Sequence, residues 1–427
     1  MKRLLASSPT FARELDELLQ SRHMADGDVS SGVAAIIREV RTRGDAALVE
    51  YNEKFDRLKL PASSLRFSAE EIEKISASCT QNVRDALSMA AKRIRSFHEK
   101  QKPSDIDYVD AIGVRLGMRW NAIKAVGMYV PGGTASYPSS VLMNAIPAKV
   151  AGVKRLVMVV PTPDGAINPA ILLAAKLAGV DEIYRIGGAQ AVAALAYGTE
   201  SITPVSMIVG PGNAYVAEAK RQVFGTVGID MVAGPSEILV VSDNQTPPEW
   251  VAADLLSQAE HDKDAQSILI TDDAAYADRV EHAIETHLKT LPRQEMASLS
   301  IHTYGGIIIV DDLSESAPII NKIAAEHLEL AVSDPSILLP KIHNAGAIFI
   351  GRHTPEAIGD YIAGPSHVLP TMQTAAFSSG LSVYSFMKKS SLIGCSEEGF
   401  RALAAATATL ADCEGLGAHA LSVRVRQ

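Results

Sequence analysis

Residues 125–160 read AVGMYVPGGTASYPSSVLMNAIPAKVAGVKRLVMVV, and this stretch decides the fold class. A short apolar run ends in Pro-Gly-Gly, a segment of helical length follows, and a second apolar run closes the stretch. Two apolar strands joined by a crossover helix form a βαβ unit, in which both strands lie parallel in one sheet. The sequence therefore predicts an α/β fold built on parallel sheets.

The same alternation continues towards the C-terminus and divides into two series. The first series contains the expected strands 125–130, 155–160, 182–186 and 206–209, with helices over 170–178 and 189–197. The second contains the expected strands 238–241, 267–270, 306–310 and 347–350, with helices over 248–261 and 274–289. Two tandem, incomplete Rossmann-like domains fit this pattern better than one long sheet.

The two ends of the chain differ from this core. The segments 29–51 and 69–101 carry apolar residues at helical spacing, and a helix is expected over 397–411, before a glycine-containing tail. We therefore expect four parts: a helical N-terminal region (1–110), a first Rossmann-like domain (111–235), a second Rossmann-like domain (236–375) and a C-terminal helical tail (376–427).

Composition and charge exclude several classes of function. The 40 basic and 49 acidic residues give a net charge of −9, and no basic stripe suited to nucleic acid stands out. No segment reaches the roughly 18 uninterrupted apolar residues of a membrane span, so we expect a cytoplasmic protein without a membrane partner. Cys79, Cys395 and Cys413 are widely spaced, which excludes a CxxC metal site. Any metal ion must then take nitrogen and oxygen ligands.

Glycine-rich segments follow three of the expected strands. They are Pro131-Gly-Gly133, Gly187-Gly-Ala-Gln190 and Gly210-Pro-Gly-Asn213. The carboxyl ends of parallel strands line the ligand crevice of an open sheet, and a helix N-terminus beyond a glycine turn favours a phosphate. The first segment alone is equally consistent with an ordinary turn, and the other two favour a ligand crevice. None has the GxGxxG pattern, so a dinucleotide would bind here in a non-standard way.

Two pairs of residues in the second half could carry metal and proton chemistry. Gln258 and His261 stand three positions apart on an expected helix, so both could reach one metal ion. Glu326 and His327 are adjacent, and a carboxylate beside an imidazole suits an oxidation that needs a base and an activated water. Taken alone, each pair is better explained as ordinary helix-surface or core residues.

Two further pairs lie nearer the C-terminus. Asp360 and His367 occupy a polar segment punctuated by glycine and proline, where they could bind a metal or substrate or simply stabilise turns. Glu414 and His419 lie on a glycine-containing tail, where they have no evident packing role.

Taken together, these segments resemble the histidinol dehydrogenases over almost the whole chain. The resemblance includes GDAAL at 44–48, the long run YVPGGTASYPSSVLMNAIPAKVAGV at 129–153 and GPSE at 234–237. Several long motifs in one order are far more specific than any one of them. The sequence departs from the family at Ala325, where members often have proline, and we expect little effect on chemistry.

The resemblance implies a role for each candidate residue. Glu326 and His327 would be the acid–base pair. Zinc would be held by Gln258, His261, Asp360 and His419. NAD would be held by Tyr129, Gln190 and Asn213, which agrees with the crevice expected at the strand ends. Substrate would be bound by Ser236, Gln258, His261, His327, Asp360, His367, Glu414 and His419.

The implied reaction is the oxidation of L-histidinol through L-histidinaldehyde to L-histidine, the end of histidine biosynthesis, with two NAD+ and one water. A homodimer is also implied, with the C-terminal tail lending Glu414 and His419 to a neighbouring subunit. Two rival interpretations remain: a dehydrogenase of the same fold with a different small hydroxy substrate, and an inactive nucleotide- or metal-binding protein. No cysteine lies in a recognisable activated setting, which disfavours covalent thiol catalysis.

Overall fold

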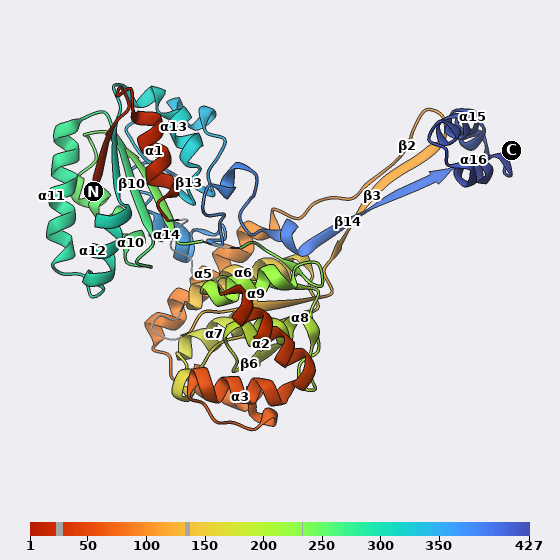
Figure 1. Ribbon diagram of the computed structural model, residues 1–427, viewed down its shortest axis with the longest axis horizontal. Coiled ribbons are helices and arrows are strands. Elements are labelled where there is room, and N and C mark those ends of the chain that lie inside the picture. The colour runs from red at the N-terminus through yellow and green to blue at the C-terminus, as the bar shows by residue number, and fades with distance from the viewer. Residues whose placement is uncertain (23–28, 133–136, 233) are drawn as a thin grey trace.

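The computed structural model describes residues 1–22, 29–132, 137–232 and 234–427. Two lobes of sheet and helix lie side by side, and a thin arm with a helical tip projects from them (Figure 1). The α/β fold predicted from the sequence is confirmed. Of the glycine turn expected after residue 130, Gly133 and residues 134–136 lie outside the described part of the chain.

The first lobe contains a five-stranded parallel sheet with the order β6-β5-β4-β7-β8. In chain order this is 3-2-1-4-5, which is the Rossmann arrangement without its sixth strand. The order reverses between β4 and β7, where such sheets bind ligands. The strands are β4 (Ala125–Tyr129), β5 (Arg155–Val159), β6 (Glu182–Tyr184), β7 (Met207–Val209) and β8 (Gly228–Ile229).

Helices cover both faces of this sheet, because alternate strand residues point to opposite sides. Val126, Met128 and Leu156 pack against the helices of one face, and Val157 and Val159 against those of the other. The first face is covered by α5 (Gln81–Glu99), α6 (Pro138–Ala151) and α7 (Pro169–Ala178), with α4 (Ala69–Ser76) beside α7. The second is covered by α2 (Ser30–Arg43), α3 (Asp45–Asp56), α8 (Gly188–Tyr197) and α9 (Ala214–Val223).

The second lobe contains a six-stranded parallel sheet with the order β1-β11-β10-β9-β12-β13. Its last five strands repeat the 3-2-1-4-5 order, and β1 extends the edge by pairing with β11. The strands are β1 (Lys2–Leu5), β9 (Glu237–Ser242), β10 (Gln266–Thr271), β11 (Gly306–Ile309), β12 (His327–Ala331) and β13 (Ala347–Ile350). The helices are α1 (Phe11–Gln20), α10 (Pro248–Ala259), α11 (Ala274–Leu288), α12 (Gln294–Tyr304), α13 (Ala317–Ile323) and α14 (Glu356–Ile358), which continues into the π-helical turn Gly359–Ala363.

The expected helical region 1–110 is divided between the lobes. Residues 2–20 form β1 and α1 of the second lobe, and residues 30–99 cover the first sheet. Each of these elements buries its apolar side against a sheet, so the region has no core of its own. The expected helical segment 29–51 contains α2 and most of α3, which are separated by Gly44 with φ of +54°.

The arm is a three-stranded antiparallel sheet with the order β14-β3-β2. Its strands are β2 (Ile106–Val109), β3 (Val114–Ala122) and β14 (Met387–Cys395), and its tip carries α15 (Glu397–Cys413) and α16 (Gly417–Arg424) (Figure 1). The sequence predicted neither β3 in the segment 111–235 nor β14 in the tail 376–427. No residue of β14 is buried, so the apolar alternation that marks a strand is absent there.

Short 3₁₀ turns complete the fold. They lie at Ala62–Ser64, Pro163–Gly165, Leu313–Glu315, Pro335–Ile337, Leu339–Lys341, Thr374–Ala376 and Val383–Phe386. Within the described ranges, no helix combines the length and the apolar character needed to cross a membrane.

Candidate active site

The candidate active site lies at the amino ends of two neighbouring strands in the second lobe. Glu237 opens β9, His327 opens β12, and His327 pairs in register with Ile238. Open parallel sheets more often place their ligands at the carboxyl ends of strands. In this lobe the candidate acid–base residues lie instead at the amino ends of the strands.

His327 is the centre of the site. It is 2% exposed, and its Nδ1 lies 3.0 Å from the main-chain oxygen of Glu237. Its Nε2 lies 3.3 Å from Oδ1 of Asp360 and 3.9 Å from Oε1 of Glu356. His327 Nδ1 also lies 3.2 Å from Gln258 Nε2, so the Glu237 oxygen and the Gln258 amide hold this edge of the ring, and Nε2 faces the carboxylates.

Three carboxylates set the charge of this imidazole. Burial alone would lower the pKa of His327, but Glu326, Asp360 and Glu356 together raise that pKa well above its usual value. Burial raises the pKa of Glu326 to about 8, against the opposing effect of His327. Glu326 Oε2 lies 3.6 Å from His327 Nδ1. Perturbed pKa values of an adjacent carboxyl and imidazole mark a candidate acid–base pair.

Asp360 and His367 are brought to the same place by the π-helical turn and the segment after it. His367 Nδ1 lies 2.9 Å from the main-chain oxygen of Asp360, and its Nε2 lies 3.1 Å from Ser140 Oγ on α6. Burial opposes ionisation of Asp360, but the hydrogen bond from His327 and the nearby imidazoles lower its pKa to about 2. Because Ser140 belongs to the first lobe, the site lies where the two lobes meet.

Gln258 and His261 also lie here, but not on one helical face as the sequence predicted. The helix α10 ends at Ala259, and His261 follows in a turn whose N–H donates to the oxygen of Gln258 at 3.0 Å. Burial lowers the pKa of His261, which favours the neutral imidazole that binds metals. Gln258 is fully buried, and its Oε1 has no hydrogen-bond partner among the described residues. An amide oxygen left in this state fits a metal ligand.

Glu414 and His419 are not brought to this site within one chain. Glu414 follows α15, His419 lies on α16, and both are exposed at the tip of the arm (Figure 1). Ser236, in contrast, directly precedes β9 and Glu237. The candidate metal ligands Gln258, His261 and Asp360 therefore gather in the second lobe, and a second subunit would have to supply the fourth.

The candidate cofactor residues surround the carboxyl edge of the first sheet. Tyr129 ends β4, and its hydroxyl oxygen accepts from the N–H of Gly188 at 3.1 Å, while burial raises its pKa to about 12. Gln190 is 2% exposed in the first turn of α8, and its Oε1 has no partner in the described part of the chain. Asn213 is exposed and caps α9 by accepting from Tyr215 N and Val216 N. All three residues thus lie at or just beyond the carboxyl ends of strands, and their role in cofactor binding stays a prediction.

The sequence did not point to Glu356. Its side chain is 2% exposed, and it forms with His327 and Asp360 a group whose potential ligand atoms lie within 4.8 Å of one another. Burial raises the pKa of Glu356 to about 8, and Ser257 Oγ donates to it at 2.6 Å. The spacing of Glu356 and Asp360, four positions apart after a proline, was the available signal.

The whole chain matches known proteins of one kind. A sequence profile described as histidinol dehydrogenase matches residues 19–427. This chain belongs to the histidinol dehydrogenase family. The enzyme named histidinol dehydrogenase from Rhodospirillum rubrum is 61% identical over 99% of this chain and 98% of its own length. The one from Agrobacterium fabrum is 59% identical over 98% of this chain and 97% of its own.

A solved structure agrees with these relatives. The crystal structure of histidinol dehydrogenase from Elizabethkingia anophelis superposes with a TM-score of 0.95 at 37% identity, covering 100% of this chain and 98% of that one. Family membership makes this protein an oxidoreductase. The family resemblance seen in the sequence motifs is confirmed.

Proposed function

We propose that this chain oxidises L-histidinol through L-histidinaldehyde to L-histidine, with two NAD+ and one zinc ion per subunit. One observation carries the proposal: the buried Glu326–His327 pair lies beside Gln258, His261 and Asp360 in a chain of the histidinol dehydrogenase family. An oxidation in two steps needs both a base for an alcohol and a group that activates water.

The residues present fit a zinc ion. Gln258, His261 and Asp360 would hold it together with His419 of the partner subunit, which makes a set of nitrogen and oxygen ligands. When bound, zinc would supply a template that fixes the imidazole and amino nitrogens of the substrate. The unpartnered Oε1 of Gln258 and the lowered pKa of His261 support this assignment.

His327 would accept the hydroxyl proton of the substrate as hydride leaves for the nicotinamide. Nδ1 lies 3.0 Å from the oxygen of Glu237, so Nε2 is the atom that would take the proton when the imidazole is neutral. The negative charges of Glu326 and Asp360, which raise the pKa of His327, would stabilise the imidazolium formed. Nε2 lies 3.3 Å from Oδ1 of Asp360, so the proton transfer would occur beside a proposed metal ligand.

Glu326 would activate the water that hydrates the aldehyde before the second hydride transfer. Its carboxyl accepts from Glu237 N at 3.0 Å, and its raised pKa of about 8 suits a group that receives a proton near neutral pH. NAD+, when bound, would serve as the hydride acceptor in both steps. Tyr129, Gln190 and Asn213 would hold each NAD+ at the carboxyl edge of the first sheet, as the unpartnered Oε1 of Gln190 supports.

The test is a histidinol assay on the purified protein. We expect two NADH per L-histidinol, loss of activity on exhaustive chelation, and recovery when zinc is added back. A protein that ignores histidinol but oxidises another amino alcohol would contradict the proposed substrate. Full activity after chelation would contradict the proposed zinc ion.

A further inference from the structure

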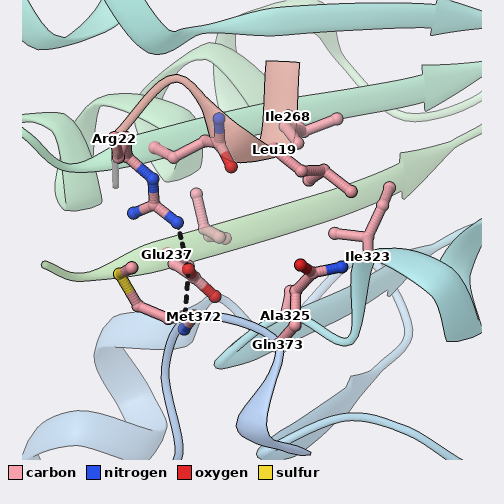
Figure 2. A pocket seen from close by; sticks show the side chains of 10 residues that line it. Leu19, Arg22, Glu237, Ile268, Ile323, Ala325, Met372 and Gln373 are labelled. Atoms are coloured by element: carbon pink, nitrogen blue, oxygen red, sulfur yellow. Dashed lines mark hydrogen bonds and ion pairs between the residues drawn. The ribbon is translucent and has the colours of Figure 1, made fainter. Parts of the chain in front are cut away.

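A buried ion pair includes Glu237, the residue whose main chain contacts Glu326 and His327. It joins Arg22, which follows α1, to Glu237 at the start of β9, and their side chains are 3% and 7% exposed (Figure 2). The Glu237 carboxylate also accepts from Met372 N at 2.9 Å. One side chain thus connects the N-terminal segment, the second sheet and the turn at residues 371–373.

The main chain of Glu237 contacts both acid–base residues. Its N–H donates to Glu326 Oε2 at 3.0 Å, and its oxygen lies 3.0 Å from His327 Nδ1. The first contact fixes where the Glu326 carboxylate lies. The second fixes the position of the Nδ1 edge of the His327 ring, together with Gln258 Nε2 at 3.2 Å.

The turn that holds Glu237 is constrained by its own packing. Met372 and Gln373 have φ of +54° and +63°, in the left-handed region that residues other than glycine rarely adopt. Thr371 Oγ1 accepts from Gly234 N at 2.7 Å, and a Cβ at Gly234 would lie 2.4 Å from Met372 Cγ. The turn and the residues preceding β9 therefore interlock, and the Glu237 carboxylate lies between them.

Stability alone does not explain this pair. Desolvation makes a buried ion pair a weak source of stability. A cavity of about 10 Å³ remains between Arg22, Glu237 and the apolar residues around them, and Arg22 Nε has no partner among the residues that the structure describes. The ion pair instead fixes the position of Glu237, whose main-chain N–H and oxygen contact Glu326 and His327.

We propose that Arg22 and Glu237 are positioning residues for the acid–base pair. Their ion pair and the bond from Met372 N fix the Glu237 peptide, which orients the Glu326 carboxylate and the His327 ring. The inference rests on the proposed function for the roles of Glu326 and His327. It adds that a residue of the N-terminal segment acts on catalysis without touching the substrate.

The test compares Arg22→Met, Arg22→Lys and Glu237→Gln with the wild type. We expect Arg22→Met and Glu237→Gln to lower kcat with histidinol by about tenfold to a hundredfold, with the KM for NAD+ unchanged. Arg22→Lys keeps the charge and should recover part of kcat. The matched control is Arg155→Met, which breaks the half-buried pair with Glu182 in the first lobe and should lower Tm without lowering kcat.

A second readout does not depend on turnover. In ¹⁵N-histidine-labelled protein, with His327 assigned by the signal lost in His327→Asn, we expect the ring signals of His327 to differ between the wild type and Glu237→Gln. If kcat and the His327 signal both stay at wild-type values while Tm falls as in the control, the inference is wrong. If the wild type does not oxidise histidinol, the proposed function is wrong and the His327 signal alone decides the inference. If Arg22→Met does not fold, Arg22→Lys and Glu237→Gln decide it.

Discussion

His327 differs from an ordinary buried histidine because carboxylates surround it on several sides. Glu326, Glu356 and Asp360 all raise its pKa, although burial acts in the opposite direction. The same burial keeps Glu326 and Glu356 from ionising freely, since the pKa of each is raised to about 8. The pKa values in this site therefore have two sources: burial raises those of the Glu326 and Glu356 carboxyls, and the neighbouring carboxylates raise that of His327.

The role of His327 can be separated from that of the metal ligands. His327→Asn keeps a polar side chain of similar size but removes the proton acceptor. We expect kcat to fall by about a hundredfold to ten-thousandfold, with zinc content unchanged. Metal analysis and steady-state kinetics on the same preparation provide the check. Equal loss of zinc and activity would instead place His327 among the ligands.

A buried carboxyl pair next to the site gives a pH-dependent prediction. Asp254 and Glu329 share a hydrogen bond, and burial raises the pKa of Asp254 to about 6 and that of Glu329 well above its usual value. Raised carboxyl pKa values favour the folded state at low pH, so this stability is lost as pH rises past the ordinary carboxyl range and through about 6. Asp254→Asn removes one of the two charges. We expect it to be more stable than the wild type at pH 8 by about 1–2 kcal/mol.

The measurement is urea unfolding at pH 4.5 and pH 8, where the advantage of Asp254→Asn should appear only at the higher pH. The exposed carboxyl variant Glu70→Gln is the control and should show no such difference. If the difference in the free energy of unfolding between Asp254→Asn and the wild type is the same at pH 4.5 and pH 8, the raised pKa values of these two carboxyls are contradicted.

At the scale of elements, the loop between β7 and α9 is fixed by one buried ion pair. Lys220 pairs with Asp230, and these two side chains bond both main-chain groups of Gly210: Lys220 Nζ to its oxygen at 2.9 Å and Asp230 Oδ2 to its N–H at 2.8 Å. Gly210 has φ of +103°, and a Cβ there would lie 2.1 Å from the oxygen of Tyr129. The loop that leads to Asn213 is thus held tightly against β4.

Lys220→Met should therefore loosen the proposed cofactor loop. It leaves Asp230 buried and unpaired, so we expect a loss of about 3–5 kcal/mol in the free energy of unfolding. We also expect at least about tenfold weaker NAD+ binding in calorimetry, because the loop is no longer held in place. The exposed pair variant Lys176→Met should change neither. If Lys220→Met loses stability but binds NAD+ as tightly as the wild type, the proposed role of this loop in cofactor binding is wrong.

The sequence predicted elements well where burial followed a simple pattern. The expected strand 347–350 matches β13, and the expected helix 274–289 ends within one residue of α11. It did not predict β12, because His327 and the buried Glu329 break the apolar run of a central strand. Glu329 is tolerated there only because Asp254 and Glu356 N lie next to it, and those contacts come from distant segments.

At the scale of the whole molecule, the arm separates two expected site residues from the rest. Glu414 and His419 lie at its tip, and only the family resemblance linked them to Gln258 and Asp360. Apolar side chains are exposed along the tip, including Ile393 at 76%, Leu410 at 66% and Leu421 at 58%. Local sequence patterns cannot show which subunit a side chain serves. A dimer that buries this tip would explain both observations.

Mixing two inactive variants tests this arrangement. If His419 of the partner subunit completes each site, a heterodimer of His327→Asn and His419→Asn subunits contains one site free of both changes. Random reassociation of equal amounts should then restore about a quarter of the sites. Activity of the reassociated mixture, compared with each variant treated alone, is the measurement. A mixture as inactive as its components would contradict exchange of the tip between subunits.

The most direct measurement is the position of zinc in crystals of the protein, located by anomalous scattering at the zinc edge. We expect one peak per subunit, at about 2.0–2.2 Å from ligand atoms of Gln258, His261, Asp360 and His419 of the partner subunit. A peak held instead by His327, Glu356 and Asp360, or no peak in active protein, would contradict the account.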